Sequence, residues 1–75
     1  MIASRMTYRR IAQLQQRLTW AIRTQHEHWR QREIAMAAGD VVAMRLADKR
    51  FRGCVRIEIR CDERIESFNK QLAAY

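Results

Sequence analysis

Two histidines flank a glutamate at His26, Glu27 and His28, and these residue types can bind zinc or transfer protons. Two metal ligands on one helical face must be three or four residues apart, as they are in the HExxH motif. His26 and His28 are two apart, so on a helix they project about 200° apart. The position at which the motif would place its second histidine is occupied by Arg30. We therefore predict no metal site here.

Two cysteines and two serines are the remaining candidates for chemistry. Cys54 and Cys61 have neither a CxxC partner nor a nearby histidine, so we expect no zinc site. Their spacing corresponds to about 10 Å along a helix, which is too far for a disulfide between them. Ser4 and Ser67 lie outside any nucleophile motif, and the chain has no glycine-rich phosphate loop. The sequence predicts a protein that is not an enzyme and has no cofactor.

Arginine offers the more promising chemistry, because its guanidinium binds phosphates and carboxylates through two parallel hydrogen bonds. The chain has 15 Lys and Arg residues, nearly all of them Arg, against 8 Asp and Glu, and its net charge is +7. A GC-rich coding sequence would produce the same preference for Arg over Lys. The net charge nevertheless predicts attraction to an acidic partner, whether nucleic acid, an anionic membrane or an acidic protein surface.

Trp20 is the most conspicuous candidate for a binding residue. On a helix it points away from the apolar stripe, among basic and glutamine side chains. A tryptophan in such surroundings is typical of a binding hot spot, and it could also stack on a nucleic-acid base. If the helix phase were different, Trp20 would pack in a core instead. The predicted binding face consists of Trp20, Arg9, Arg17, Arg23 and Arg30.

Two long helices joined by one turn must position these side chains. In the stretch AMAAGDVVA, residues 35–43, Gly39 can adopt the left-handed conformation that ends a helix, and Asp40 can cap the next one. The chain has no proline and only two glycines, so it lacks the turns of an all-β fold. We predict a single all-α domain, residues 1–75, folded as an antiparallel helical hairpin. Its first helix runs from an N-cap at Ser4 to residue 38, and its second from 41 to 73.

Apolar residues recur in steps of three and four in both halves of the chain. The predicted stripe of the first half, interrupted by Gln25, is Tyr8, Ile11, Leu14, Leu18, Ile22, Trp29 and Met36. The stripe of the second half is Met44, Ala47, Phe51, Cys54, Glu58, Cys61, Ile65, Phe68 and Leu72. Folding the chain at the turn places Gln25 and Glu58 about one turn apart across the seam. Such a polar pair can fix register and oligomeric state, although water at a bundle end would also accommodate Glu58.

The segment GCVRIEIRCD, residues 53–62, alternates apolar and charged residues as a half-buried strand does. Because the stripe keeps its phase across this segment and no partner strand is visible, we favour a continuous helix. Val55 and Ile59 then project to one flank of the stripe and Ile57 to the other, an arc too wide for one partner helix. We therefore expect a homodimer with four helices. Gly53 could allow another backbone to approach closely, or could simply weaken the helix.

The sequence also predicts where the protein is located in the cell and what it does. The chain contains no run of 18 apolar residues and no signal-peptide core, so we expect a cytoplasmic protein without membrane association.

The hairpin dimer resembles the plasmid copy-number control proteins, which are helical-hairpin dimers that bind RNA, but the resemblance is one of topology and implies no residue roles. The favoured prediction is a small regulator or inhibitor, of the kind common in phages and mobile elements, that binds an acidic host protein. The alternative is an RNA- or DNA-binding dimer.

Overall fold

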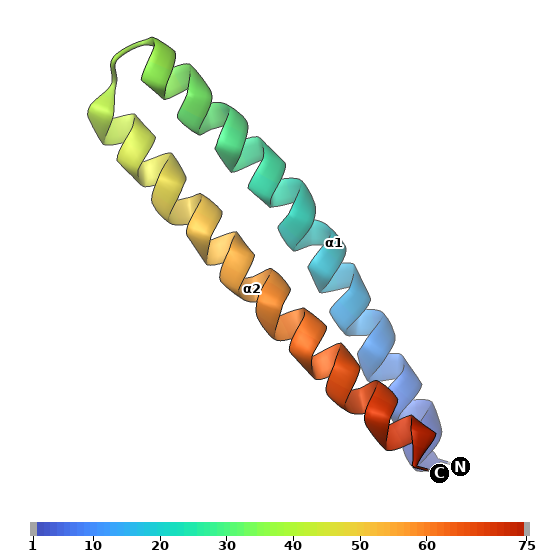
Figure 1. The fold of residues 1–75 in the computed structure, drawn as a ribbon. Coiled ribbons are helices and arrows are strands. Elements are labelled where there is room, and N and C mark those ends of the chain that lie inside the picture. Colours follow the sequence, from blue (N-terminus) through green and yellow to red (C-terminus); the bar gives the residue numbers. More distant parts are fainter. Residues whose placement is uncertain (1, 75) are drawn as a thin grey trace.

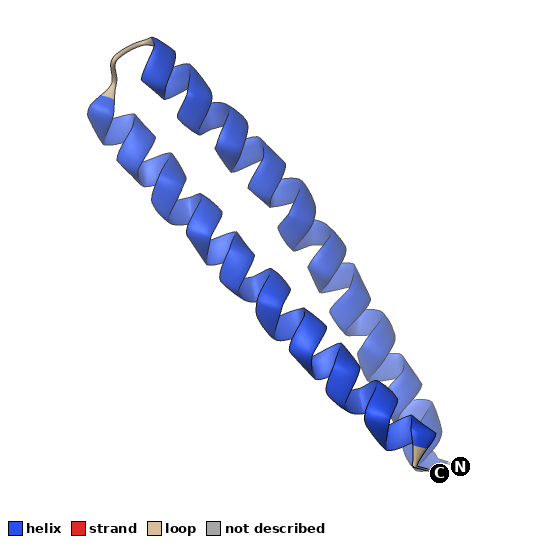
Figure 2. Ribbon diagram, in the orientation of Figure 1, coloured by secondary structure: helices blue, strands red, loops and turns tan. Residues whose placement is uncertain are grey.

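Two antiparallel helices form the whole of the computed structural model, which describes residues 2–74 (Figure 1). Helix α1 spans Ile2–Ala37 and helix α2 spans Val41–Ala73. They pack along their length into a rod of 56 × 14 × 12 Å, with both chain ends at one tip and the turn at the other. The described residues contain no strand, and α2 continues unbroken through residues 53–62, which confirms the prediction of helix there (Figure 2).

The turn between the helices consists of a glycine followed by a capping aspartate. Gly39 has a φ of 69°, a conformation that costs little only in glycine. The backbone N–H of Asp40 donates to the carbonyl of Ala35 at 2.9 Å, which closes the end of α1. The Asp40 Oδ1 atom then accepts a hydrogen bond from the N–H of Ala43 at 3.0 Å and caps the start of α2.

The start of α1 differs from the prediction. Ser4 was expected to be the N-cap, but the helix begins at Ile2 and includes it. An N-cap contributes only about 1 kcal/mol, so adjacent residues with helical preference can extend a helix past a serine.

The face of α1 that packs against α2 also differs from the predicted stripe. The buried and half-buried residues of α1 form a seam in which the spacing is alternately four and three residues. The seam consists of Thr7, Ile11, Leu14, Leu18, Ala21, Gln25, His28, Arg32 and Ala35, and Thr24 is half-buried beside it. Four members of the predicted stripe lie beside this seam and are exposed: Tyr8, Ile22, Trp29 and Met36. The prediction favoured large apolar side chains. The residues of α1 that pack against α2 instead recur every 3.5 residues on average, as in a coiled coil. This repeat brings small and polar residues into the contact between the helices.

The predicted stripe of α2 is confirmed, because all nine of its residues are buried or half-buried. The most deeply buried described residues of the rod are nevertheless mostly small: Ile11, Ala21, Ala35, Ala47, Cys54 and Cys61. No large side chain among the described residues is fully buried. A single hairpin therefore has a thin core and gains little from burial of apolar surface.

We predict that replacing each of the two glycines by alanine has opposite effects on the free energy of unfolding. Gly39→Ala should lower the free energy of unfolding by about 1 kcal/mol, because φ is positive there. Gly53→Ala should raise it by about 1 kcal/mol, because the glycine lies within α2 and an added Cβ meets nothing within 4 Å. Urea unfolding followed by circular dichroism at one protein concentration measures both. Destabilisation by Gly53→Ala would contradict the open space around this residue.

Candidate binding site

A polar contact links the two helices near the middle of the seam. Gln25 Nε2 donates a hydrogen bond of 2.8 Å to Glu58 Oε1, and the pair is partly buried. The two residues, which were predicted to lie about one turn apart across the seam, are in direct contact. Because the hydrogen bond joins one position of α1 to one position of α2, sliding the helices past each other by one turn would break it.

A second polar cluster lies nearer the turn. Arg32 Nε of α1 lies 3.5 Å from Asp48 Oδ1 of α2, an ion-pair distance, but this buried nitrogen forms no hydrogen bond. Arg52 Nη2 lies 3.0 Å from Asp48 Oδ2. The Arg32 guanidinium also lies 4.9 Å from the centre of the Trp29 ring, at a cation–π distance. Asp48 thus joins the two helices electrostatically.

One side of the rod carries an apolar flank next to the seam. The ring of Trp29 packs against that of Phe51 with centroids 5.2 Å apart, and Met36 and Val41 line one hollow beside the turn. Residues in phase with these side chains continue the surface on both helices. We define the apolar flank as Tyr8, Ile22, Trp29, Met36, Val41, Val55 and Ile59. All are exposed except Val55, which is half-buried. Asp48 and Asp62 share the helical phase of Val41 and Val55, so the flank is a mostly apolar surface that two carboxylates interrupt.

The opposite side of the seam contains a groove with arginines on both rims. Leu14, Arg17, Ile57, Arg60, Cys61 and Arg64 line its middle, and Arg10, Gln13 and Phe68 extend it toward the chain ends. We define the basic groove by its apolar floor, Leu14, Ile57, Cys61 and Phe68, and by its rims, Arg10 and Arg17 of α1 and Arg60 and Arg64 of α2. The floor is buried to half-buried, and the four arginines are exposed.

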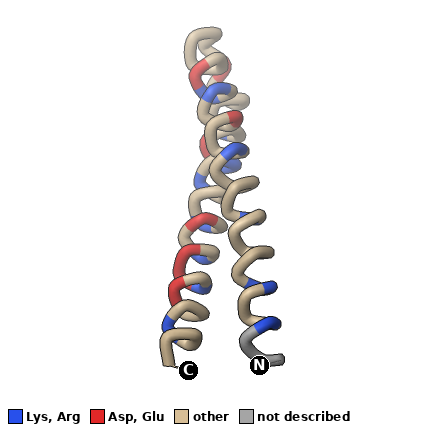
Figure 3. Tube along the Cα trace, turned by 90° about the vertical axis from the view of Figure 1, so that its right-hand side faces the viewer, with Lys and Arg blue, Asp and Glu red and all other residues tan. Residues whose placement is uncertain are grey.

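Among the described residues, the cations that form ion pairs are Arg30, Arg32, Arg52 and Lys70. None of the four groove arginines forms one. Acidic residues do occur at this end of the rod, along the C-terminal half of α2 (Figure 3). Asp62 and Glu66 project to the other side of α2 from Arg60 and Arg64, whereas Glu63 lies one turn after Arg60 but forms no ion pair with it among the described residues. The groove therefore concentrates positive charge that the chain itself does not neutralise.

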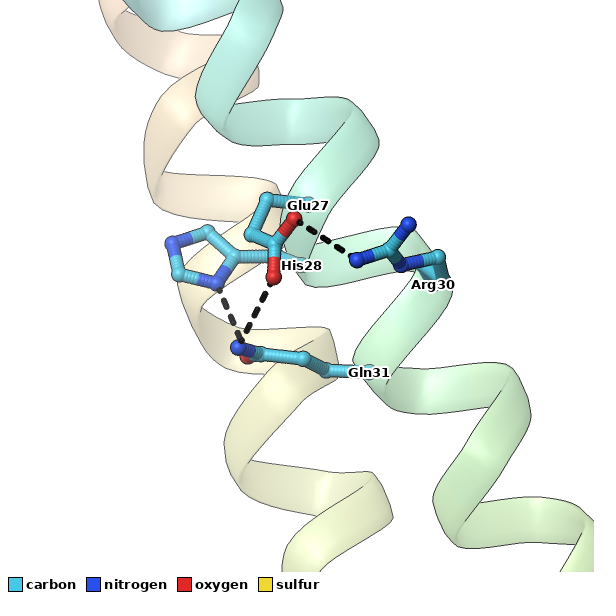
Figure 4. Close-up of polar contacts among 4 residues, drawn as sticks. All are labelled: Glu27, His28, Arg30 and Gln31. Atoms are coloured by element: carbon cyan, nitrogen blue, oxygen red, sulfur yellow. Dashed lines mark hydrogen bonds and ion pairs between the residues drawn. The ribbon is translucent and has the colours of Figure 1, made fainter.

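The structure divides the predicted binding face. Arg17 lies on the groove, and Trp20 lies one turn beyond it on α1 with 53% of its surface exposed, so Trp20 does not pack in the core of the hairpin. Arg9 and Arg23 project from the outer face of α1, away from α2. Arg30 is also on the outer face, where its Nη2 atom lies 3.7 Å from Glu27 Oε2 (Figure 4).

The prediction from sequence missed three of the four groove arginines, Arg10, Arg60 and Arg64. In the sequence of the second helix, Arg60 and Arg64 stand among acidic residues, of which helical phase places Asp62 and Glu66 on another side of the helix. The available signal was the spacing relative to the seam. Arg10 and Arg17 are seven residues apart, each directly before a seam residue of α1, while Arg60 and Arg64 bracket Cys61 of α2.

His28, Gln31 and Glu27 form a short chain of polar contacts on α1 (Figure 4). His28 Nδ1 lies 3.4 Å from Gln31 Oε1, and Gln31 Nε2 donates to Glu27 Oε1 at 3.5 Å. Within residues 2–74, no group of three or more His, Cys, Asp or Glu side chains could hold a metal ion. Cys54 and Cys61 are buried free thiols. Neither described helix is long and apolar enough to cross a membrane.

No model of a known protein family, no curated protein and no solved structure matches this chain. The basic groove and the apolar flank are therefore interpreted from their own chemistry.

We predict that the polar contact between Gln25 and Glu58 lowers the stability of the hairpin but fixes the alignment of its two helices. Replacing both Gln25 and Glu58 by Leu should raise the free energy of unfolding by about 1–2 kcal/mol, because two half-buried polar groups become apolar. Glu58→Leu alone should gain less, because the Gln25 amide loses its acceptor. Thermal unfolding measures both effects, with the exposed Glu63→Leu as the control. The double variant should also lose its single helix alignment, seen as extra cross-peaks in NMR. Lower stability with one alignment would contradict this role.

Proposed function

We propose that this protein is a small non-enzymatic regulator or inhibitor that binds an acidic surface of a host protein through the basic groove. The observation that supports this most strongly is the set of four arginines without acidic partners around a partly exposed apolar floor. Arginines on both rims attract carboxylates, and the floor supplies apolar contact area. Trp20, half-exposed beside Arg17, adds a side chain of the kind that dominates binding energy at protein interfaces.

Nucleic acid is the second candidate, because the same four arginines could bind phosphates. Two features favour a protein instead. A phosphate backbone would use the rims but would gain nothing from the apolar floor made by Leu14 and Ile57. The acidic residues along the C-terminal half of α2 would also repel a long polyanion that extended past the groove (Figure 3).

We also propose that the protein is a homodimer in which the apolar flanks of two hairpins form a four-helix bundle. The flank extends along α1 from Tyr8 to Met36, 28 residues later, which corresponds to about 42 Å, so a second copy could contact it along most of the rod. The thin core of one hairpin leaves its large apolar side chains to be covered by the second copy. Because the basic groove lies on the other side of the seam, both grooves of this dimer remain open.

Ile22→Glu tests the proposed dimer. A glutamate in the apolar flank would be desolvated in the interface, so the dissociation constant should rise by about 100-fold or more. Ile34→Glu is the matched control, because Ile34 is more exposed and lies 14 residues after Trp20, in phase with it and away from the flank. Sedimentation equilibrium measures both variants. A wild-type protein that is monomeric and stably helical at micromolar concentration would contradict the proposal.

A matched pair of charge-reversal variants tests the function. The double variant Arg17→Glu and Arg64→Glu reverses the groove, whereas Arg9→Glu and Arg23→Glu makes the same change of net charge on the outer face. In pull-downs from source-cell lysate treated with nuclease, wild type and the outer-face variant should retain the same defined protein, and the groove variant should lose it. Equal loss in both variants would mean that net charge alone determines binding. Capture that disappears with nuclease would favour the nucleic-acid candidate.

A further inference from the structure

We infer that the partner segment in the basic groove is an amphipathic helix with acidic residues on both flanks, which packs as a third helix against α1 and α2. This inference rests on the proposed function of the groove and adds the shape and the sequence pattern of its ligand.

The floor of the groove has the length and direction that suit a helix. It is formed by residues of both antiparallel helices, so the groove follows the long axis of the rod. Ile57 and Phe68 are 11 residues apart on α2, which corresponds to about 16 Å, or three helical turns. A helix lying along this groove can insert its side chains between those of α1 and α2.

An extended peptide would fit this surface poorly. Its backbone N–H and C=O groups would face an apolar floor, and buried backbone groups without partners are costly. The described residues of the hairpin include no strand, so they offer no sheet edge to which an extended peptide could add. A helix satisfies its backbone hydrogen bonds internally and presents only side chains to the floor.

The charge distribution specifies the sequence pattern of this helix. One rim carries Arg10 and Arg17 from α1, and the other carries Arg60 and Arg64 from α2. A helix lying between them meets arginines on both of its sides. It should therefore carry apolar residues in steps of three and four, with Glu or Asp at the positions flanking that stripe on each side.

Two further residues lie on the groove side of the rod, Gly53 on α2 and Trp20 on α1. Gly53 lies one turn before Ile57 on the same side of α2, and a Cβ added there would meet nothing within 4 Å. On α1, Trp20 lies one turn beyond Arg17 and is half-exposed. The Gln25–Glu58 and Trp29–Phe51 contacts place Gly53 two to three turns nearer the inter-helix turn than Trp20, so a bound helix would meet them at different points along its length.

A synthetic peptide provides the test. It contains three heptads, about 21 residues, with Leu at the two apolar positions of each heptad and Glu on both flanks. Repulsion between the Glu flanks limits self-association at neutral pH. Fluorescence anisotropy should show that it binds the full-length protein, and circular dichroism should show increased helix on mixing. A scrambled peptide of identical composition should bind at least about tenfold more weakly.

A charge exchange locates the binding to the groove. The groove variant, with Arg17→Glu and Arg64→Glu, should bind the Glu-flanked peptide at least about tenfold more weakly and should gain affinity for a peptide with Lys flanks. The outer-face variant, with Arg9→Glu and Arg23→Glu, should bind the Glu-flanked peptide as wild type does. Its net charge equals that of the groove variant, so it controls for general electrostatic attraction.

The contrary outcomes separate the inference from the proposed function. If scrambled and amphipathic peptides bind equally, and only groove reversal weakens both, the acidic-partner proposal stands and the helical ligand is wrong. If the groove and outer-face variants are affected equally, both ideas are wrong. If duplex RNA displaces the peptide from the groove at lower concentration, with a steep dependence on salt, the ligand is nucleic acid and the inference fails.

Discussion

The narrow seam between α1 and α2 is the constraint on which the other features of this protein depend. Its most buried members are largely alanines and cysteines, which allow the two helices to lie close together over the length of the rod. A close contact between two helices can cover only one stripe on each. Large side chains beside the stripe therefore remain at the surface, and the hairpin has one side rich in apolar residues and one side rich in arginine.

The polar contacts in the seam determine which residues meet on these two sides. Gln25 pairs with Glu58 near the middle of the rod, and Arg32 faces Asp48 nearer the turn. Both contacts join the helices at defined positions, and together they oppose sliding of one helix along the other. This alignment brings the arginines of α1 to the same part of the rod as those of α2. We expect this alignment to cost part of the stability that a wholly apolar seam would have.

Sequence alone was sufficient for some of this architecture and insufficient for the rest, for physical reasons. The stripe of α2 was predictable because its apolar residues keep one phase from Met44 to Leu72, and the turn coincides with the Gly39–Asp40 pair. The stripe of α1 was displaced to one side because its true contact face includes His28 and Arg32, which a hydrophobic pattern does not select. The basic groove required knowledge of how the two helices face each other, since no segment of either helix contains it.

We propose that the two sides of the hairpin have different tasks, one in self-association and one in partner binding. Each side has its own tryptophan: in a single hairpin Trp29 is 44% exposed and Trp20 is 53% exposed. Acrylamide quenching of two single-tryptophan variants, Trp20→Phe and Trp29→Phe, compares the two sides directly. We expect Trp29 to be shielded at concentrations where the dimer forms and to become accessible on dilution, while Trp20 stays accessible until the acidic helix is added. Equal quenching of both tryptophans at all concentrations, or shielding of Trp20 by self-association, would contradict the account.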